Sequence, residues 1–251
     1  MERARVLVVV AHPDDETFGL GSVIAGAVDR GAEVVVCCAT RGEAGESLVE
    51  PGEGQSLGDL RAAELHAAGD ILGVSRHVLL GFADSGMRGT APPDSLVGAP
   101  EAEVVDAVRR VVDEVHPSLV VTLDPVTSDG HRDHDRIGAA TLAAVADRPE
   151  VTAYVWCVPR PVLEQWFAQL ALVRPDTEHL AEPEPPPGRP MEEVTTILDS
   201  RPYMELRARA SAAHASQSSP FEGMPPELRD AFIGTDHLVR IQPPWTGGEP
   251  E

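Results

Sequence analysis

An apolar run that ends in a cluster of polar residues limits most strongly how this chain can fold. Residues 6–10 (VLVVV) are followed directly by residues 11–16 (AHPDDE). A continuous apolar run of this length is typical of a strand covered on both faces, and the polar residues after it are typical of a functional loop. The pattern returns where residues 118–123 (SLVVTL) precede residues 130–134 (GHRDH). Two strand ends that each carry histidine and aspartate are therefore able to meet around one metal ion.

Predicted strands alternate with predicted helices over most of the chain. We expect strands over residues 6–10, 33–39, 77–80, 118–123, 151–157 and 194–198, and helices over residues 17–30, 59–72, 101–115, 134–145 and 203–214. This succession predicts an α/β fold with a mainly parallel, Rossmann-like sheet and helices on both faces. Ligands of such sheets bind beyond the carboxyl ends of the strands, which is where both polar clusters fall.

Length and charge restrict the class of protein. With 251 residues, 42% of them hydrophobic, the chain can bury one sizeable core, so we expect a single domain over residues 1–251 that includes an exposed loop rich in proline and glutamate over residues 174–190. The formal net charge of -21 argues against nucleic acid and against anionic membranes as partners. No apolar stretch approaches the length of a membrane span, and the first strand follows the N-terminus directly, so we expect a cytoplasmic protein, either a monomer or a homo-oligomer.

The two polar clusters contain the side chains that a catalytic metal site needs. His12 precedes a proline, which favours extended backbone, and Asp15 falls near the start of the next helix, whose positive end favours an ionised carboxylate. His131 and His134 are three residues apart at another helix entrance and can point toward one site. Two histidines and one aspartate with an open fourth position are typical of catalytic zinc. Each cluster alone is also compatible with a helix cap or a solvated loop, and their joint occurrence at two strand ends favours the metal site.

Other catalytic motifs are absent or incomplete in the sequence. Residues 19–24 (GLGSVI) resemble the start of a dinucleotide-binding fingerprint but lack its third small residue. The sequence contains no P-loop, no Gly-x-Ser-x-Gly and no His-Glu-x-x-His motif. Cys37 and Cys38 fall in an apolar strand without an activating base, and with Cys157 we expect them to be reduced, buried thiols. Covalent catalysis by serine or cysteine is therefore unsupported.

Residues 11–16 together with residues 131–134 (HRDH) resemble the PIG-L/LmbE-like zinc-dependent N-deacetylases. That family includes deacetylases of the mycothiol and bacillithiol pathways and the mycothiol conjugate amidase. Further segments resemble family landmarks in the expected order, namely residues 40–45 (TRGEAG), 61–65 (RAAEL), 84–87 (DSGM) and 213–217 (AHASQ). The resemblance extends over most of the chain.

The resemblance implies a metal site and a catalytic base. By similarity His12, Asp15 and His134 would be the metal ligands. The metal would be Zn²⁺, with Fe²⁺ or another divalent ion as the alternative. Asp14 would be the general base that takes a proton from the zinc-bound water, and a metal of this kind lowers the pKa of that water toward neutrality.

The resemblance also implies roles for four further residues. His131 would lie beside the substrate carbonyl, where it stabilises the oxyanion or helps to protonate the leaving amine, and Asp133 would orient or tune this histidine. Arg61 and Asp84 are the expected contacts to the polar groups of a sugar. Each of these two residues is equally compatible with a structural role, as a salt bridge or a turn cap.

By this resemblance the chain is a hydrolase that removes the N-acetyl group from an N-acetylglucosamine-type glycoconjugate. The alternatives are a metal-dependent amidase that acts on a thiol conjugate or another amide, and a noncatalytic metal-binding member. Asp129 departs from the mycothiol-pathway members, which have a tyrosine two residues before the first histidine of the second motif. The departure favours another small-molecule substrate, such as a soluble glycoconjugate or a secondary-metabolite aminosugar.

Overall fold

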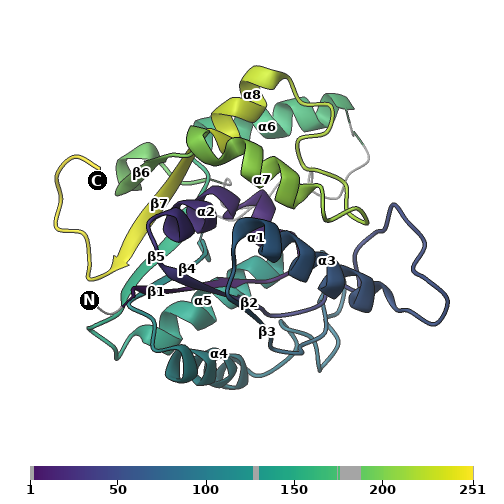
Figure 1. Cartoon of the computed structure of the whole chain (residues 1–251), viewed down its shortest axis with the longest axis horizontal. Coiled ribbons are helices and arrows are strands. Elements are labelled where there is room, and N and C mark those ends of the chain that lie inside the picture. The colour runs from purple at the N-terminus through teal and green to yellow at the C-terminus, as the bar shows by residue number, and fades with distance from the viewer. Residues whose placement is uncertain (1–2, 127–129, 174, 176–187, 251) are drawn as a thin grey trace.

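Seven strands form one sheet in the computed structural model of the chain, which describes residues 3–126, 130–173, 175 and 188–250 (Figure 1). The strands are β1 (Arg5–Val10), β2 (Glu33–Cys38), β3 (Arg76–Leu79), β4 (Leu119–Leu123), β5 (Thr152–Cys157), β6 (Thr196–Asp199) and β7 (Thr235–Gln242). Their order is β3-β2-β1-β4-β5-β7-β6. The strands from β3 to β5 are parallel, whereas β7 is antiparallel to both β5 and β6. The sheet is therefore mainly parallel, as predicted.

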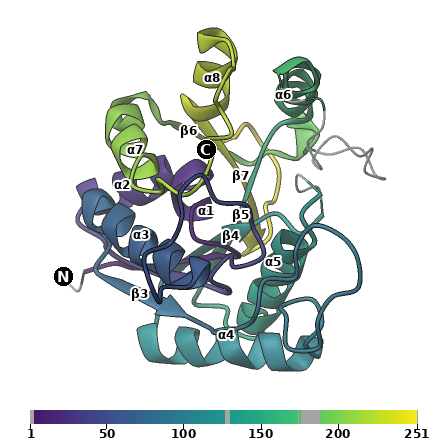
Figure 2. The ribbon, with the colours of Figure 1, turned by 90° about the vertical axis from the view of Figure 1, so that its right-hand side faces the viewer.

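Helices cover both faces of this sheet. They are α1 (Asp15–Phe18), α2 (Gly21–Asp29), α3 (Leu57–Leu72), α4 (Glu101–Val115), α5 (Arg132–Val145), α6 (Arg160–Val173), α7 (Met204–Ser211) and α8 (Pro226–Ile233), with short 3₁₀ helices η2 (Met191–Glu193) and η3 (Arg201–Tyr203). In Figure 2, α4 and α5 lie on one face, and α1, α2, α3 and α7 lie on the other. Helices α6 and α8 contact each other and stand at the top of Figures 1 and 2.

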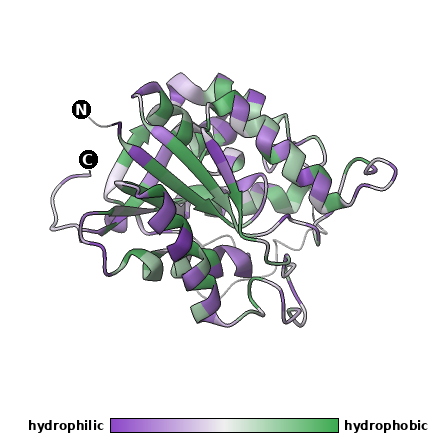
Figure 3. Ribbon diagram, turned by 60° about the horizontal axis from the view of Figure 1, so that its bottom comes forward, coloured by the Kyte–Doolittle hydropathy of each residue, from purple (hydrophilic) through white to green (hydrophobic). Residues whose placement is uncertain are grey.

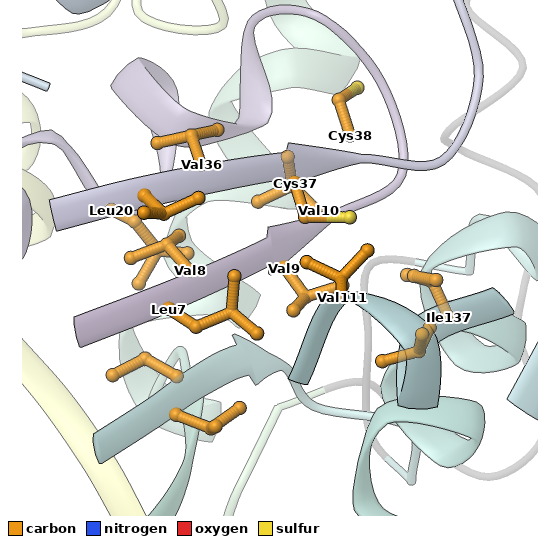
Figure 4. Close-up of a cluster of buried hydrophobic side chains, with 14 of the residues drawn as sticks. Leu7, Val8, Val9, Val10, Leu20, Val36, Cys37, Cys38, Val111 and Ile137 are labelled. Carbon is orange, nitrogen blue, oxygen red and sulfur yellow. The ribbon is translucent and has the colours of Figure 1, made fainter. Parts of the chain in front are cut away.

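The core lies between the sheet and these two helical layers. Side chains from Leu7 to Val10 in β1 are fully buried and pack with Leu20, Val36 and Ile137 from both layers and the neighbouring strand (Figure 4). Burial of each such aliphatic side chain stabilises the fold by about 1.5–3 kcal/mol. Figure 3 shows the strands as mostly hydrophobic and the outer helices as mixed in hydropathy. This pattern explains why β1 is a continuous apolar run in the sequence.

The chain order creates a crevice at one place along the sheet. From β1 the chain continues to β2 and β3 on one side, and later returns to β4 and β5 on the other side of β1. Loops that leave the carboxyl ends of β1 and β4 consequently diverge to opposite sides, which opens a binding crevice between them. These are the loops that carry the two polar clusters.

One predicted helix differs in the structure, and three elements were not predicted. The helix expected over residues 17–30 is interrupted at Gly19 and Leu20, between α1 and α2. Glycine suits this break, because a Cβ at position 19 would lie 3.0 Å from the Asp15 carbonyl oxygen and 3.4 Å from the Trp156 ring. Arg207 donates hydrogen bonds to the carbonyls of Thr17, Phe18 and Gly19 at this break. The elements that were not predicted are α6, α8 and β7.

Several smaller expectations have different outcomes. Cys37, Cys38 and Cys157 are buried free thiols, as expected, and burial raises the pKa of Cys37 to about 12. Within the described residues, no helix is both long enough and apolar enough to cross a membrane.

Most of the loop expected over residues 174–190, and also Asp129, lie outside the described residues. The described end of that loop contains Arg189, whose guanidinium forms two hydrogen bonds with the Asp124 carboxylate at 2.6 and 2.8 Å.

Candidate active site

The loop after β1 and the first turn of α5 bring the two polar clusters together in the crevice. The ring centroids of His12 and His131 are 4.4 Å apart, and those of His131 and His134 are 4.8 Å apart. His12 lies two residues beyond β1, and His131 is the N-cap residue of α5, whose side chain accepts the Asp133 backbone N–H. The predicted meeting of two strand ends is therefore what the structure shows.

Several side chains in this crevice have atoms close enough together to be donors to one metal ion. One ring nitrogen from each of His12, His131 and His134 lies within 4.8 Å of the other two. Asp15 Oδ1 is 3.2 Å from His134 Nε2, and Asp15 Oδ2 is 3.6 Å from His12 Nδ1. Imidazole and carboxylate groups are the donors that Zn²⁺ and similar divalent ions accept. The donor set thus contains the predicted ligands His12, Asp15 and His134, and adds His131 to them.

Asp15 is held as a carboxylate. Its Oδ2 accepts hydrogen bonds from the backbone N–H groups of Ala11 and His12, at 3.1 and 2.8 Å. Burial opposes ionisation, but the neighbouring His134 and His12 outweigh it and hold the pKa of Asp15 well below its usual range. An ionised carboxylate in a fixed orientation suits a metal ligand.

Asp14 lies in the same cavity but in a different electrostatic environment. Its backbone has φ 130°, and its N–H donates to Glu16 Oε2 at 2.9 Å. Arg61 Nη2 donates to Asp14 Oδ2 at 3.0 Å. Burial raises the pKa of Asp14 to about 6, although the Arg61 charge opposes that rise. Asp14 is therefore able to accept and release a proton near neutral pH.

Arg61 and Asp84 are both largely buried. Arg61 also donates to the backbone oxygens of Pro13 at 2.6 Å and Gly42 at 2.8 Å, so its guanidinium is bonded within the protein itself. Asp84 accepts the Gly86 N–H at 2.8 Å, and its Oδ1 is 3.6 Å from His12 Nε2. Both residues line the cavity, and their contact with a sugar stays a prediction.

Asp133 contacts a histidine other than the one expected from the family resemblance. Its Oδ2 lies 3.2 Å from His12 Nε2 and accepts the Ser85 N–H at 3.0 Å. A carboxylate in this position orients a metal-ligating histidine. Asp133 Oδ1 is buried and has no hydrogen-bond partner among the described residues. One Asp133 oxygen also lies within 4.8 Å of an Asp84 oxygen and a His12 ring nitrogen, a second group that could hold a cation. The predicted role of Asp133 toward His131 stays a prediction.

Sequence reasoning did not assign a role to the buried pair behind Asp14. His214 Nε2 lies 2.7 Å from Glu16 Oε1, and both side chains are excluded from solvent. Glu16 in turn accepts the Asp14 N–H, so the pair supports the loop that carries Asp14. The only signal in the sequence was that His214 falls in the segment AHASQ, which resembles a family landmark.

A cavity of about 850 Å³ opens over these residues. Of the predicted site residues only Asp133 is missing from its described lining. Residues 44–48 and 216–218 line one part, whose polar side chains are Glu46, Ser47, Ser216, Gln217 and Ser218. A second part is apolar and includes Phe18, Trp156, Leu163, Trp166, Phe221 and Phe232. The aromatic part of the lining was not predicted.

Known proteins resemble this chain in sequence and in fold. The family model described as PIG-L, GlcNAc-PI de-N-acetylase, matches residues 7–145. Proteins of Rhodococcus jostii (strain RHA1) and Streptomyces avermitilis, both named 1D-myo-inositol 2-acetamido-2-deoxy-alpha-D-glucopyranoside deacetylase, are 37% and 36% identical to it. The first alignment covers 96% of this chain and 93% of the relative, and the second covers 95% and 92%.

Solved structures with low sequence identity share the fold. An N,N'-diacetylchitobiose deacetylase from Pyrococcus horikoshii has a TM-score of 0.62 at 22% identity, and the match covers 96% of this chain and 88% of that one. GalB, a 4-carboxy-2-hydroxymuconate hydratase from Pseudomonas putida KT2440, has a TM-score of 0.65 at 19% identity, with 98% and 99% coverage. The same fold thus carries more than one reaction, and the reaction has to be argued from the site.

Proposed function

The chain belongs to the PIG-L family, described as GlcNAc-PI de-N-acetylases, and from this premise and the geometry of the crevice we propose that it is a metal-dependent hydrolase that removes the acetyl group from an N-acetylglucosamine-type glycoconjugate. One observation carries the proposal more than any other. Asp14, whose pKa is raised to about 6, lies in the same cavity as the donors His12, Asp15 and His134. Amide hydrolysis needs both groups, because an amide is a poor electrophile and its amine is a poor leaving group.

The residues proposed to hold the metal are His12, Asp15 and His134, with His131 within reach of the same position. We infer Zn²⁺ as the resident ion because histidine and aspartate donors with an open position are typical of catalytic zinc. When bound, this ion polarises the amide carbonyl and lowers the pKa of a water molecule. Asp133 would keep His12 in orientation through the contact at His12 Nε2.

Asp14 is proposed to move the proton. As a carboxylate it takes a proton from the attacking water, and as the acid so formed it delivers that proton to the leaving amine nitrogen. Its pKa near 6 suits both steps at neutral pH, and Arg61 fixes Oδ2 in place. His131, beside His12, is proposed to stabilise the negative charge on the former carbonyl oxygen or to share in protonating the amine.

Substitution Asp14→Asn tests the proposal. It keeps the shape of the side chain and removes the base, so the release of primary amine from N-acetylglucosamine glycosides should fall by about 10²- to 10⁴-fold while the bound metal content is unchanged. Asp106→Asn on α4 is the control, because Asp106 is an exposed partner of Arg109 far from the cavity lining. Normal turnover in the metal-loaded Asp14→Asn protein would refute the assignment of the base.

A further inference from the structure

The apolar part of the cavity lining points to the class of group that the substrate carries. We propose that the aglycone of the glycoconjugate is an aryl or alkyl group that packs against an aromatic wall, which consists of Trp156, Trp166, Phe221 and Phe232. This inference rests on the proposed function, because the wall lines the cavity that contains the candidate catalytic residues. It goes further by assigning a substrate class to that cavity.

The four rings form one continuous surface. The Phe232 ring centroid lies 5.2 Å from that of Phe221, 6.4 Å from that of Trp166 and 6.5 Å from that of Trp156. They come from four places in the chain, since Trp156 is in β5, Trp166 is in α6, Phe232 is in α8 and the fourth ring precedes α8. Helices α6 and α8 contact each other, and both stand at the top of Figure 2. The wall therefore joins rings from these two helices to the Trp156 ring at the end of the sheet.

The wall begins close to the proposed metal ligands. A Cβ on Gly19 would lie 3.4 Å from Trp156 Cζ3, and the Gly19 N–H bonds to the carbonyl oxygen of Asp15 at 2.9 Å. One short helix, α1, therefore separates the edge of the Trp156 ring from the carboxylate ligand Asp15. A sugar whose acetamido group reaches the metal donors would place its aglycone within range of these rings.

The polar atoms of the wall are already used inside the protein. Trp156 Nε1 donates to Asp236 Oδ1 at 2.9 Å, and Trp166 Nε1 donates to the Pro220 carbonyl at 3.1 Å. Both indole N–H groups are thus bonded to other parts of the chain, and the wall presents ring carbons to the cavity. A polyol on this surface would lose hydrogen bonds to water without replacing them, whereas an apolar group would gain by leaving water.

The charges of the lining disfavour an anionic aglycone. Arg61 is the single guanidinium among the described lining residues, and Asp14 already engages it. The carboxylates of Glu46 and Asp84, which are not among the proposed metal ligands, line the same cavity. A phosphate or carboxylate on the aglycone would meet these like charges, and a neutral aryl or alkyl group would not.

The test compares glycosides of N-acetylglucosamine that differ only in the aglycone. The metal-loaded protein is given the octyl, phenyl and myo-inositol glycosides and the free sugar, and the release of primary amine is measured. We expect kcat/KM for the octyl or phenyl glycoside to exceed that for the inositol glycoside by at least about tenfold, the ratio that about 1.4 kcal/mol of differential binding gives. An inositol glycoside that is hydrolysed equally well or better would overturn the inference.

Two substitutions of Phe232, with a control at Phe167, test whether any preference for an apolar aglycone comes from the wall. Phe232→Ser should lower the ratio of kcat/KM for the octyl glycoside to that for the free sugar by about tenfold, as is typical for loss of an aromatic contact. Phe167→Ser is the control for packing, because Phe167 contacts the Trp166 ring, with centroids 5.1 Å apart, from outside the cavity lining, and its ratio should fall less than that of Phe232→Ser. Phe232→Leu, which keeps an apolar side chain, should restore most of the ratio and guards against misfolding as the cause. An unchanged ratio in Phe232→Ser would overturn the inference.

These outcomes separate the inference from the function on which it rests. If no glycoside and no free sugar releases amine, the proposed deacetylation fails. If amine is released from all of them without a preference for octyl or phenyl, the deacetylation stands and the aromatic wall is not a subsite for the aglycone.

Discussion

Asp14 joins a rare backbone conformation to a carboxylate that titrates near neutrality. Its φ of 130° is unusual for any residue with a side chain, and such strain persists only where the surrounding structure imposes it. Here the Glu16 carboxylate accepts the Asp14 N–H, and Arg61 holds the Asp14 side chain. The strained backbone of this loop thus directs the Asp14 carboxylate into the cavity.

The pH dependence of turnover should report the ionisation of Asp14. Burial raises the pKa of Asp14 to about 6, and a base works only in its deprotonated form, so activity is present above that pKa and is lost as the pH falls through it. We expect kcat/KM to be half-maximal near pH 6 and to drop about tenfold for each unit below it. A profile that stays flat down to pH 4.5, about the usual range of carboxylates, would contradict the assignment.

Arg61 should set the pH at which activity is lost on the acid side of the profile, here called the acid limb. The Arg61 charge lowers the pKa of Asp14, so Arg61→Gln should move the limb to higher pH. Arg76→Gln is a suitable control, because Arg76 is partly exposed and pairs with Glu114 away from the cavity lining. The measurement is kcat/KM against pH for the three proteins. Superimposable acid limbs for Arg61→Gln and the parent protein would show that the ion pair does not tune the base.

At the scale of elements, the break between α1 and α2 is held by one buried guanidinium. Arg207 in α7 donates to the carbonyls of Thr17, Phe18 and Gly19. Carbonyls at the end of a helix lack the backbone N–H donors that a further turn would provide. Helix α1 has only four residues, so these contacts fix the direction in which Asp15 enters the crevice. A distant helix thus stabilises the loop that carries the proposed metal ligand.

Substitution Arg207→Met should reveal this dependence as a loss of stability. It leaves buried carbonyls without donors, and we expect the free energy of unfolding to fall by about 3 kcal/mol. Arg209→Met is the matched control in the same helix, since Arg209 is exposed, and its effect should stay within about 0.5 kcal/mol. Urea unfolding of the three proteins measures the difference. Equal midpoints for Arg207→Met and the parent would mean that water or neighbouring groups satisfy these carbonyls.

The sequence predicted most clearly the strands that are buried on both faces. β1 and β4 are buried on both faces and therefore appear as continuous apolar runs, which also located His12 and His131 at their ends. β7 (TDHLVRIQ) is half exposed and mixes polar with apolar residues, so its pattern did not stand out. The contacts of Asp133 with His12 and of His214 with Glu16 join positions 121 and 198 residues apart. Local sequence patterns do not reveal contacts between residues so far apart in the chain, which only the folded structure brings together.

At the scale of the whole molecule, the surface carries a large excess of negative charge. The chain has 41 Asp and Glu residues against 20 Lys and Arg residues, which gives a formal net charge of -21. A field of this sign repels anionic ligands over a distance of about the Debye length, which shortens from about 30 Å in 0.01 M salt to about 3 Å in 1 M salt. The acidic cavity lining adds to this field at short range.

Salt should therefore change how the protein discriminates between neutral and anionic substrates. The comparison uses the p-tolyl and p-carboxyphenyl glycosides of N-acetylglucosamine, which have similar shape and differ by one negative charge. We expect the tolyl glycoside to have the higher kcat/KM at low salt, and the ratio of the two values to fall as salt screens the repulsion, since steering of charged ligands depends on ionic strength. Any general effect of salt on the enzyme cancels in this ratio, because the same protein acts on both substrates. A ratio that is independent of salt would locate the discrimination in direct contacts within the cavity, at Asp84 and its neighbours, rather than in the field of the whole molecule.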